Sequence, residues 1–249
     1  MNYGALAPIY DRIMAHVGYH QWLSLIDHVV DAYGGTPHPT IFELGGGTGV
    51  LGRQCADAGF TYIGSDLSMS MCRQASRRNL RFVCADAKRL PLKRSVRFDV
   101  VLFLYDGINY CMTVSDYRQV FSEVHAHLND GGLFLFDITT LFNSQTNFIE
   151  YVDADDLGDS FYFRHSYYDN ASGIQHNDFT IFSASPGQPN LYEKSLERHR
   201  QKVFSVENVR DSVPETLFEI VGIWDNFSLR KYNARSERIH FLLRKKGVA

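Results

Sequence analysis

The chain has 249 residues, of which 45% are hydrophobic, so it can bury the core of one α/β domain that carries an inserted subdomain. Its formal net charge of −3 and pI near 6.4 argue against capture of long nucleic acids, which requires a basic face. No apolar run approaches the roughly 18 residues that cross a bilayer, so we expect no membrane contact. Four scattered cysteines and a start without a signal-peptide pattern predict a cytoplasmic protein.

Two helices are expected at the start of the chain, the first short and the second long. The segment "YGALAPIYDRIM" has the pattern of a short helix, and "YHQWLSLIDHVVDAYGG" that of a longer one. In the longer segment the apolar residues fall at helical spacing, and Gly34-Gly35 ends the helix.

Five short apolar runs then alternate with helical segments. The runs, rich in strand-forming residues, cover 40–45, 61–66, 81–86, 98–104 and 132–139. The clearest helix between them is "SDYRQVFSEVHAHL", with Ser115 as its predicted cap and Gly131-Gly132 behind it. Strands alternating with helices predict a doubly wound, mostly parallel sheet of the Rossmann type.

The alternation stops after residue 139 and resumes near 206. Turn signals at "DNASG" and "SPGQPN" predict three antiparallel strands, near 160–169, 173–184 and 192–205. The preceding "EYVDADDLGD" has the composition of an acidic loop, and "SVENVRDSV" that of a short helix. With "TLFEIVGIW" and "RIHFLLRKK" as the last strands, we expect an α/β fold with a seven-stranded sheet and an antiparallel β insertion after the fifth strand.

The glycine-rich stretch "IFELGGGTGV" is expected to form the ligand-binding turn. Ligands of such sheets bind beyond the carboxyl ends of the strands, which places residues 45–49, Asp66 and Asp86 around one crevice. Gly47, Gly49 and Gly52 also match G-x-G-x-x-G, the fingerprint of nicotinamide dinucleotide sites. However, the strand already reaches Gly45, and Glu43 would repel a pyrophosphate, whereas a carboxylate suits a cationic sulfonium nucleoside.

Three motifs carry a resemblance to a known family. "ELGGGTG" resembles motif I of class I S-adenosylmethionine-dependent methyltransferases, "GSDLSMSM" their second motif and "CADAKRLP" their third. The start, "YGALAPIYDRIMAHVGYHQW", is similar to the leader of a bacterial small-molecule methyltransferase subgroup, and "LYDGINYC" and "LFDIT" extend the match. The resemblance covers nearly the whole chain.

The resemblance implies S-adenosyl-L-methionine as cofactor and a division of the chain into three parts. Residues 1–35 would form a helical lid, 36–144 and 206–249 the cofactor-binding core, and 145–205 the insertion that covers the acceptor site. Asp66 would bind the ribose, and Asp86 and Ala87 the adenine, with Met71 packed nearby. The full expected set of cofactor-binding residues is Tyr10, Glu43, Gly45, Gly46, Gly47, Gly49, Asp66, Leu67, Met71, Asp86, Ala87 and Leu104.

Acceptor-binding residues are expected on the N-terminal segment, after the fourth strand and on the insertion. They are Tyr3, Tyr19, Tyr105, Asn109, Tyr110, His199 and Arg200. Methyl transfer depends mainly on holding the nucleophile in line, so no base is required by the motifs. The catalytic residue is left open among Tyr10, Tyr105, Asn109 and His199, and no paired spacing predicts a metal site.

The predicted function is methyl transfer from S-adenosylmethionine to a small molecule, with an amine favoured over a hydroxyl or carboxylate. Two alternatives stay open at this point: an NAD(P)-dependent oxidoreductase that uses residues 47–52, and a non-catalytic S-adenosylmethionine-binding module. A methylated macromolecule is disfavoured by the acidic balance. The aromatic-rich insertion suits a homodimer interface equally well.

Overall fold

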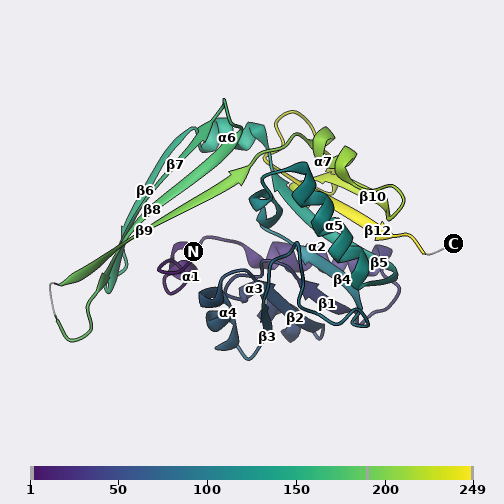
Figure 1. Cartoon of the computed structure of the whole chain (residues 1–249), viewed down its shortest axis with the longest axis horizontal. Helices are drawn as coiled ribbons and strands as arrows, with labels where there is room; N and C mark the ends of the chain where they lie inside the picture. Colours follow the sequence, from purple (N-terminus) through teal and green to yellow (C-terminus); the bar gives the residue numbers. More distant parts are fainter. Residues whose placement is uncertain (1–2, 189–190, 248–249) are drawn as a thin grey trace.

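Two separate β-sheets organise the structure, a computed structural model that describes residues 3–188 and 191–247 (Figure 1). The larger sheet contains β1 (Thr40–Glu43), β2 (Thr61–Asp66), β3 (Arg81–Cys84), β4 (Phe98–Phe103), β5 (Leu128–Thr139), β10 (Phe218–Asp225), β11 (Arg230–Lys231) and β12 (Arg238–Lys245). The smaller sheet contains β6 (Glu150–Asp156), β7 (Ser160–Asp169), β8 (Ile174–Ala184) and β9 (Tyr192–Lys202).

The larger sheet has the order β11-β10-β12-β5-β4-β1-β2-β3. Strands β3, β2, β1, β4 and β5 are parallel, whereas β12 pairs antiparallel with both β5 and β10. The order reverses between β1 and β4, which is the switch point where a doubly wound sheet binds its ligand. The seven predicted strands are all present, and the two-residue β11 adds an eighth at the edge.

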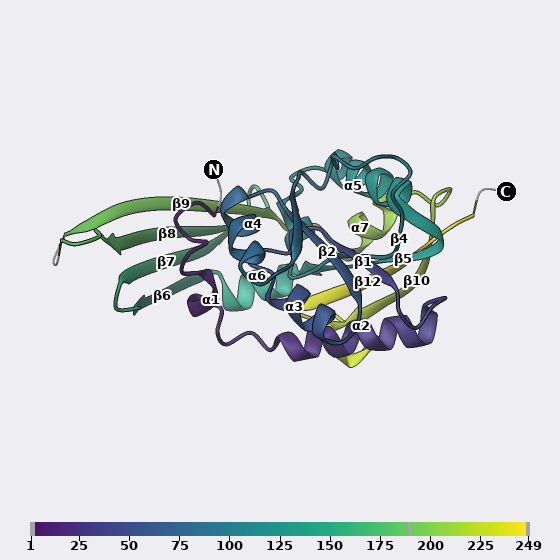
Figure 2. The ribbon, with the colours of Figure 1, turned by 90° about the horizontal axis from the view of Figure 1, so that it is seen from below.

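Helices cover both faces of this sheet. The helices of the described residues are α1 (Tyr10–Ile13), α2 (Tyr19–Tyr33), α3 (Val50–Asp57), α4 (Met69–Ser76), α5 (Val114–His127), α6 (Leu141–Asn147) and α7 (Val206–Ser212), with single 3₁₀ turns η1 (Gly107–Tyr110) and η2 (Asn226–Ser228). Helices α2 and α3 pack on one face, and α5 and α7 on the other. Figure 2 shows α2 running along its face of the sheet, with α5 opposite.

Two helix boundaries differ from the sequence prediction. The cap of α5 is Thr113 instead of Ser115, because Thr113 and Asp116 form a reciprocal capping box that starts the helix at Val114. At the start of the chain only one turn, α1, is α-helical, and the residues before it form irregular turns. Among the described residues no helix combines the length and apolar character needed to span a bilayer.

The insertion is a four-stranded antiparallel sheet that projects from the main body (Figure 1). The prediction of an acidic loop over "EYVDADDLGD" is wrong for residues 150–156, which form the edge strand β6 paired with β7. Its acid Asp153 accepts hydrogen bonds from Tyr162 (2.9 Å) and Arg164 (3.0 Å) across the pair. Acidic side chains on an edge strand also discourage further strand pairing.

The N-terminal segment packs against the inner face of the insertion. Leu6, Ile9 and Ile13 share a buried cluster with Phe179 and Ile181 of β8. Figures 1 and 2 both place α1 beside the smaller sheet. The start of the chain and the insertion therefore form one structural unit over the carboxyl ends of the parallel strands.

One buried amide joins the insertion to the main sheet. The side chain of Asn109 in η1 is fully buried, donates from Nδ2 to the carbonyl oxygen of Lys202 (2.9 Å) and accepts from the N–H of Thr139 (3.2 Å). These contacts connect η1, the end of β9 and the end of β5. Asn109 therefore fixes the point from which the insertion leaves the core.

We expect Asn109→Ala to destabilise the protein by about 2–4 kcal/mol, because it leaves two buried backbone groups without partners. Urea unfolding followed by circular dichroism measures this loss. The control is Asn147→Ala, which removes exposed contacts to Asn143 and Glu237 and should change stability by less than about 0.5 kcal/mol. Equal effects of the two substitutions would contradict this role.

Candidate active site

A crevice of about 590 Å³ opens at the carboxyl ends of β1, β2 and β4. This volume is within the range of roughly 300–1,000 Å³ that is usual for small-molecule sites. Its lining comes from the glycine turn, the strand ends, η1 and the N-terminal segment: Tyr3, Tyr10, Tyr19, Trp22, Glu43, Gly45, Gly46, Gly47, Thr48, Val50, Leu51, Asp66, Leu67, Ser68, Ala85, Asp86, Ala87, Lys88, Phe103, Leu104, Tyr105, Gly107, Tyr110 and Cys111.

The turn after β1 requires glycine for conformation and for space. Gly47 has φ +57°, and a Cβ there would meet no atom within 4 Å, so it would enter the crevice. Gly49 has φ +78° and lies against α4, where a Cβ would approach Leu80 to 2.8 Å. Left-handed backbone at these positions favours glycine and leaves the turn open to a ligand.

Two carboxyl groups border this turn. Asp66 at the end of β2 accepts hydrogen bonds from the N–H groups of Gly47 (3.0 Å) and Ser68 (2.8 Å), one on each oxygen. Burial raises the pKa of Asp66, and the two N–H groups offset part of that effect. Each carboxylate oxygen keeps a lone pair, and Asp66 lines the crevice. The carboxylate can therefore accept further hydrogen bonds from hydroxyl groups of a ligand.

Glu43 ends β1 and is only 4% exposed. It accepts a hydrogen bond from the hydroxyl of Tyr62. Burial raises the pKa of Glu43 to about 7, although the bond from Tyr62 opposes this, and the nearby Asp66 raises it further. Glu43 therefore changes charge near neutral pH, directly under the glycine turn.

An aromatic wall closes the other side of the crevice. Tyr3, Tyr10, Tyr19 and Tyr105 line it, and the rings of Tyr3 and Tyr10 meet edge to face at a centroid distance of 5.8 Å. Burial raises the pKa of all four phenols, so they stay neutral at physiological pH. The wall presents π faces and hydroxyl groups, both of which suit a cation.

The N-terminal part of this wall is held at two anchor points. Glu197 on β9 accepts hydrogen bonds from the N–H groups of Tyr3 (2.6 Å), Ala5 (2.6 Å) and Leu6 (2.9 Å). Asp11 in α1 accepts from the hydroxyl of Thr48, at the glycine turn, and pairs with Arg78. Residues 3–11 are thereby fixed across the mouth of the crevice.

The turn after β4 is held by a buried ion network. Tyr105 and Asp106 have φ +59° and +51°, a left-handed conformation that costs non-glycine residues energy. The guanidinium of Arg238 pairs with Asp106 (2.9 Å) and with the fully buried Asp137. It also lies 4.8 Å from the ring centroid of Tyr105, and Gln201 on β9 donates to Asp106. Four segments thus meet at this turn.

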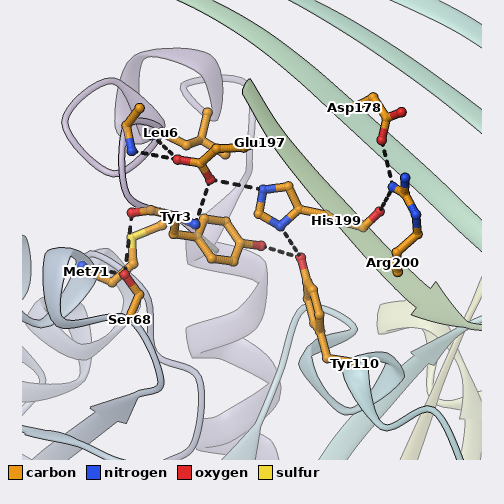
Figure 3. A network of polar contacts seen from close by, with 10 residues as sticks. Tyr3, Leu6, Ser68, Met71, Tyr110, Asp178, Glu197, His199 and Arg200 are labelled. Atoms are coloured by element: carbon orange, nitrogen blue, oxygen red, sulfur yellow. Dashed lines mark hydrogen bonds and ion pairs between the residues drawn. The ribbon is translucent and has the colours of Figure 1, made fainter. Parts of the chain in front are cut away.

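The structure places most predicted site residues on the crevice, with five exceptions. Met71 is buried in α4, and Gly49 lies against the same helix. Asn109 is committed to the two backbone bonds described above. Arg200 lies on the opposite face of the insertion, where it pairs with Asp178 (2.6 Å). His199 is buried one layer behind the lining, against Tyr3 and Tyr110 (Figure 3).

Several residues of the site had no clear signal in the sequence. Trp22 has the spacing of a core residue but also lines the crevice, and Lys88 lies in the third motif without a predicted role. Glu197 and Arg238 act through partners about 100 to 190 residues away, so sequence spacing could not reveal them. The described residues contain no cluster of three or more potential metal ligands.

Residues 41–132 match the family model described as a methyltransferase domain. A putative methyltransferase from Bacillus subtilis (strain 168) is 28% identical over 255 residues, which cover 98% of each chain. The similarity to this relative therefore extends well beyond residues 41–132, through the N-terminal segment and the insertion.

Two solved structures show the same fold. An S-adenosylmethionine-dependent methyltransferase from Clostridium acetobutylicum superposes with a TM-score of 0.81 at 24% identity, covering 98% of this chain and 99% of the other. The sugar N-methyltransferase KedS8 from Streptoalloteichus superposes with a TM-score of 0.74 at 17% identity, covering 96% and 93%.

The raised pKa of Glu43 predicts a pH-dependent stability. Between its ordinary pKa of 4.5 and the folded value of about 7, the folded chain keeps a proton that the unfolded chain releases. Stability contributed by this proton is lost as the pH rises through that window, by about 3 kcal/mol at pH 8. Glu43→Gln does not titrate, so at pH 8 it should be more stable than the wild type by up to about this amount.

Thermal unfolding at pH 4.5 and pH 8 measures the effect. The difference between variant and wild type should be small at the lower pH and large at the higher one. Glu219→Gln, on an exposed position of β10, is the control and should show the same small difference at both. A pH-independent difference for Glu43→Gln would show that Glu43 titrates normally.

Proposed function

The chain is a class I S-adenosylmethionine-dependent methyltransferase, and we propose that it methylates the nitrogen of a small-molecule amine. The observation that best supports this proposal is the chemistry of the crevice wall, which combines aromatic faces with the carboxyl groups of Glu43 and Asp66. Lys88 is the only lysine or arginine among its described lining residues. A carboxylate or phosphate acceptor calls for an arginine fork, whereas an ammonium group suits aromatic faces and carboxylates.

The residues at the strand ends fit the cofactor. S-adenosylmethionine supplies a methyl group on a positively charged sulfonium. In our proposal Asp66 accepts hydrogen bonds from its ribose hydroxyls, while Asp86 and Ala87, with Leu67 and Leu104, hold the adenine. The open turn at Gly45, Gly46 and Gly47 receives the methionine end. Met71 and Gly49 contribute only by packing, since neither lines the crevice.

The nicotinamide alternative does not suit this turn. A pyrophosphate over Gly47 would lie beside Asp66 and Glu43, with no lysine or arginine of the described lining at the glycine turn itself. A sulfonium compound carries the opposite charge and is attracted by the same groups. The aromatic wall supports the same conclusion, and in our proposal the crevice-lining Tyr10 and Tyr19 face the sulfonium.

The acceptor is expected to bind between the post-β4 turn and the N-terminal segment. Tyr3, Tyr105 and Tyr110 line that end of the crevice, and the anchors at Glu197 and Asp11 keep the segment over it. A site closed in this way holds the nucleophile and the methyl group at a fixed separation, which is the main source of acceleration for such a displacement. It also supports a small acceptor over a macromolecule.

We also propose a cellular location and an oligomeric state for the protein. We place the protein in the cytoplasm, since all four cysteines are free thiols. The outer face of the insertion exposes Phe161, Phe163 and Leu196, which suits a homodimer contact. Sedimentation velocity over a range of concentrations tests the assembly, and a monomer at every concentration would overturn it.

Calorimetry and a labelled-donor assay test the function. We expect S-adenosylhomocysteine to bind at sub-millimolar concentration and label from methyl-labelled S-adenosylmethionine to enter primary amines before alcohols or carboxylic acids. No binding of S-adenosylhomocysteine would remove the premise. Binding with labelling of alcohols alone would replace the amine by a hydroxyl acceptor.

Asp66→Asn tests the proposed ribose contact. Loss of the charge and of one acceptor oxygen should weaken S-adenosylhomocysteine binding by about 10- to 100-fold, the equivalent of a charge-assisted hydrogen bond. Asp57→Asn is the matched control, because Asp57 pairs only with Arg53 on the exposed side of α3. Unchanged affinity in a folded Asp66→Asn protein would contradict the assignment.

A further inference from the structure

Four polar side chains from three distant segments form a chain behind the acceptor end of the crevice (Figure 3). The hydroxyl of Tyr3 lies 2.6 Å from that of Tyr110, which lies 3.1 Å from Nδ1 of His199. On the other side of the imidazole, Nε2 lies 3.4 Å from a carboxylate oxygen of Glu197. Tyr3 and Tyr110 line the crevice, whereas His199 and Glu197 are buried behind them.

The charge on Glu197 determines the direction of this chain. Burial would raise the pKa of Glu197, but the contact with His199 and the N–H groups of Leu6, Tyr3 and Ala5 hold it below its usual value. The group is therefore a carboxylate, and it attracts an N–H at Nε2. Neutral His199 then has its lone pair on Nδ1, where it accepts the hydrogen of the Tyr110 hydroxyl.

The two phenols can pass a proton but cannot keep a charge. Burial raises the pKa of Tyr3 and Tyr110, with Asp66 and Asp106 adding to the effect, so neither forms a stable phenolate. His199 meets Asn177 and Phe179 from β8, neither of which titrates. The titratable groups that face it are thus Tyr3, Tyr110 and Glu197. In this chain the imidazole Nδ1 carries the nitrogen lone pair at which the transferred proton can stop.

We propose that Tyr3, Tyr110, His199 and Glu197 form a relay that removes a proton from the amine acceptor. This inference rests on the proposed amine methylation. An amine bound as ammonium has no lone pair for attack and must first lose one proton. That proton moves to the Tyr3 oxygen, the Tyr3 hydrogen moves to the Tyr110 oxygen, and the Tyr110 hydrogen moves to Nδ1 of His199. Each phenol thus ends neutral, and the resulting imidazolium is stabilised by Glu197.

The reaction then balances without another reactant. The freed nitrogen lone pair forms the bond to the methyl carbon, and the carbon–sulfur bond breaks with its electron pair staying on sulfur. The products are a methylated ammonium and S-adenosylhomocysteine, and His199 returns its proton to solvent. The relay side chains thus carry the proton, and the chain around them positions the acceptor.

A purely structural role is the competing explanation, because Glu197 also anchors the N-terminal segment. The tautomer of His199 distinguishes the relay from a purely structural role, and measuring it requires no methyl acceptor. In ¹⁵N-histidine-labelled protein with S-adenosylhomocysteine, we expect the neutral imidazole to carry its proton on Nε2, with His199→Gln assigning the signal. A neutral imidazole protonated on Nδ1 would overturn the relay, because that nitrogen would have no room for another proton.

Kinetics provide the second test, with glucosamine, tyramine and glycine as amine probes and labelled S-adenosylmethionine as donor. Tyr110→Phe and His199→Gln should lower kcat by about 10²- to 10⁴-fold, the usual range for loss of general-base catalysis, with S-adenosylhomocysteine affinity within about twofold of the wild type.

Tyr167→Phe and His176→Gln are matched controls on the outer face of the insertion, where their rings stack on each other, and both should keep wild-type kcat. Wild-type kcat in Tyr110→Phe and His199→Gln would overturn the relay while leaving the methyltransferase assignment intact. A wild-type protein that binds S-adenosylhomocysteine and methylates none of the amine probes would instead count against the amine acceptor. In that case the ¹⁵N measurement of the His199 tautomer still tests whether Nδ1 is free to accept a proton.

Discussion

The pairing of Arg238 with Asp106 and Asp137 is the constraint on which the crevice wall after β4, the proposed acceptor end, depends. Each partner comes from a different part of the main sheet, and Gln201 adds the insertion. Burying one cation with two carboxylates is costly unless geometry and hydrogen bonds compensate, so such a cluster strongly favours a single arrangement. Here it stabilises the left-handed turn that places Tyr105 in the crevice.

The same cluster also contributes to the electrostatic potential of the site. With Arg238 protonated, its pairing with two carboxylates leaves a net negative charge close to the aromatic wall whenever both acids are ionised. Glu43 and Asp66 add acidic groups at the other end of the crevice. In the proposed function both the methyl donor and the ammonium acceptor are cations, so these buried acids attract both substrates.

The sequence could place the residues at the strand ends on one crevice because their arrangement is local. The glycine turn and the acids belong to two consecutive βαβ units, β1-α3-β2 and β2-α4-β3, and this topology brings Glu43, Asp66 and Asp86 together. The fold followed from the same alternation of strands and helices. The error at β6 arose because acidic residues on an edge strand have the composition of a loop.

The acceptor side was less predictable because its contacts span the whole chain. Glu197 binds backbone groups of Tyr3 and Leu6, which leave no trace in side-chain patterns. Along β9 Glu197 and His199 lie on one face of the strand and Arg200 on the other, and which face turns inward depends on packing against the N-terminal segment. Arg200 was assigned to the site for its charge, yet its face of the sheet points away.

Because Glu197 anchors the N-terminal segment, this segment and the insertion depend on each other structurally, although they are far apart in the sequence. In the proposed function the core holds the donor, while the insertion and residues 3–11 together enclose the acceptor. Grafting a foreign insertion onto this core would leave the three N–H groups without their carboxylate unless the leader were exchanged with it. If these segments select the acceptor as proposed, acceptor choice in this scaffold can be transplanted only as a matched pair of segments, the N-terminal segment together with the insertion.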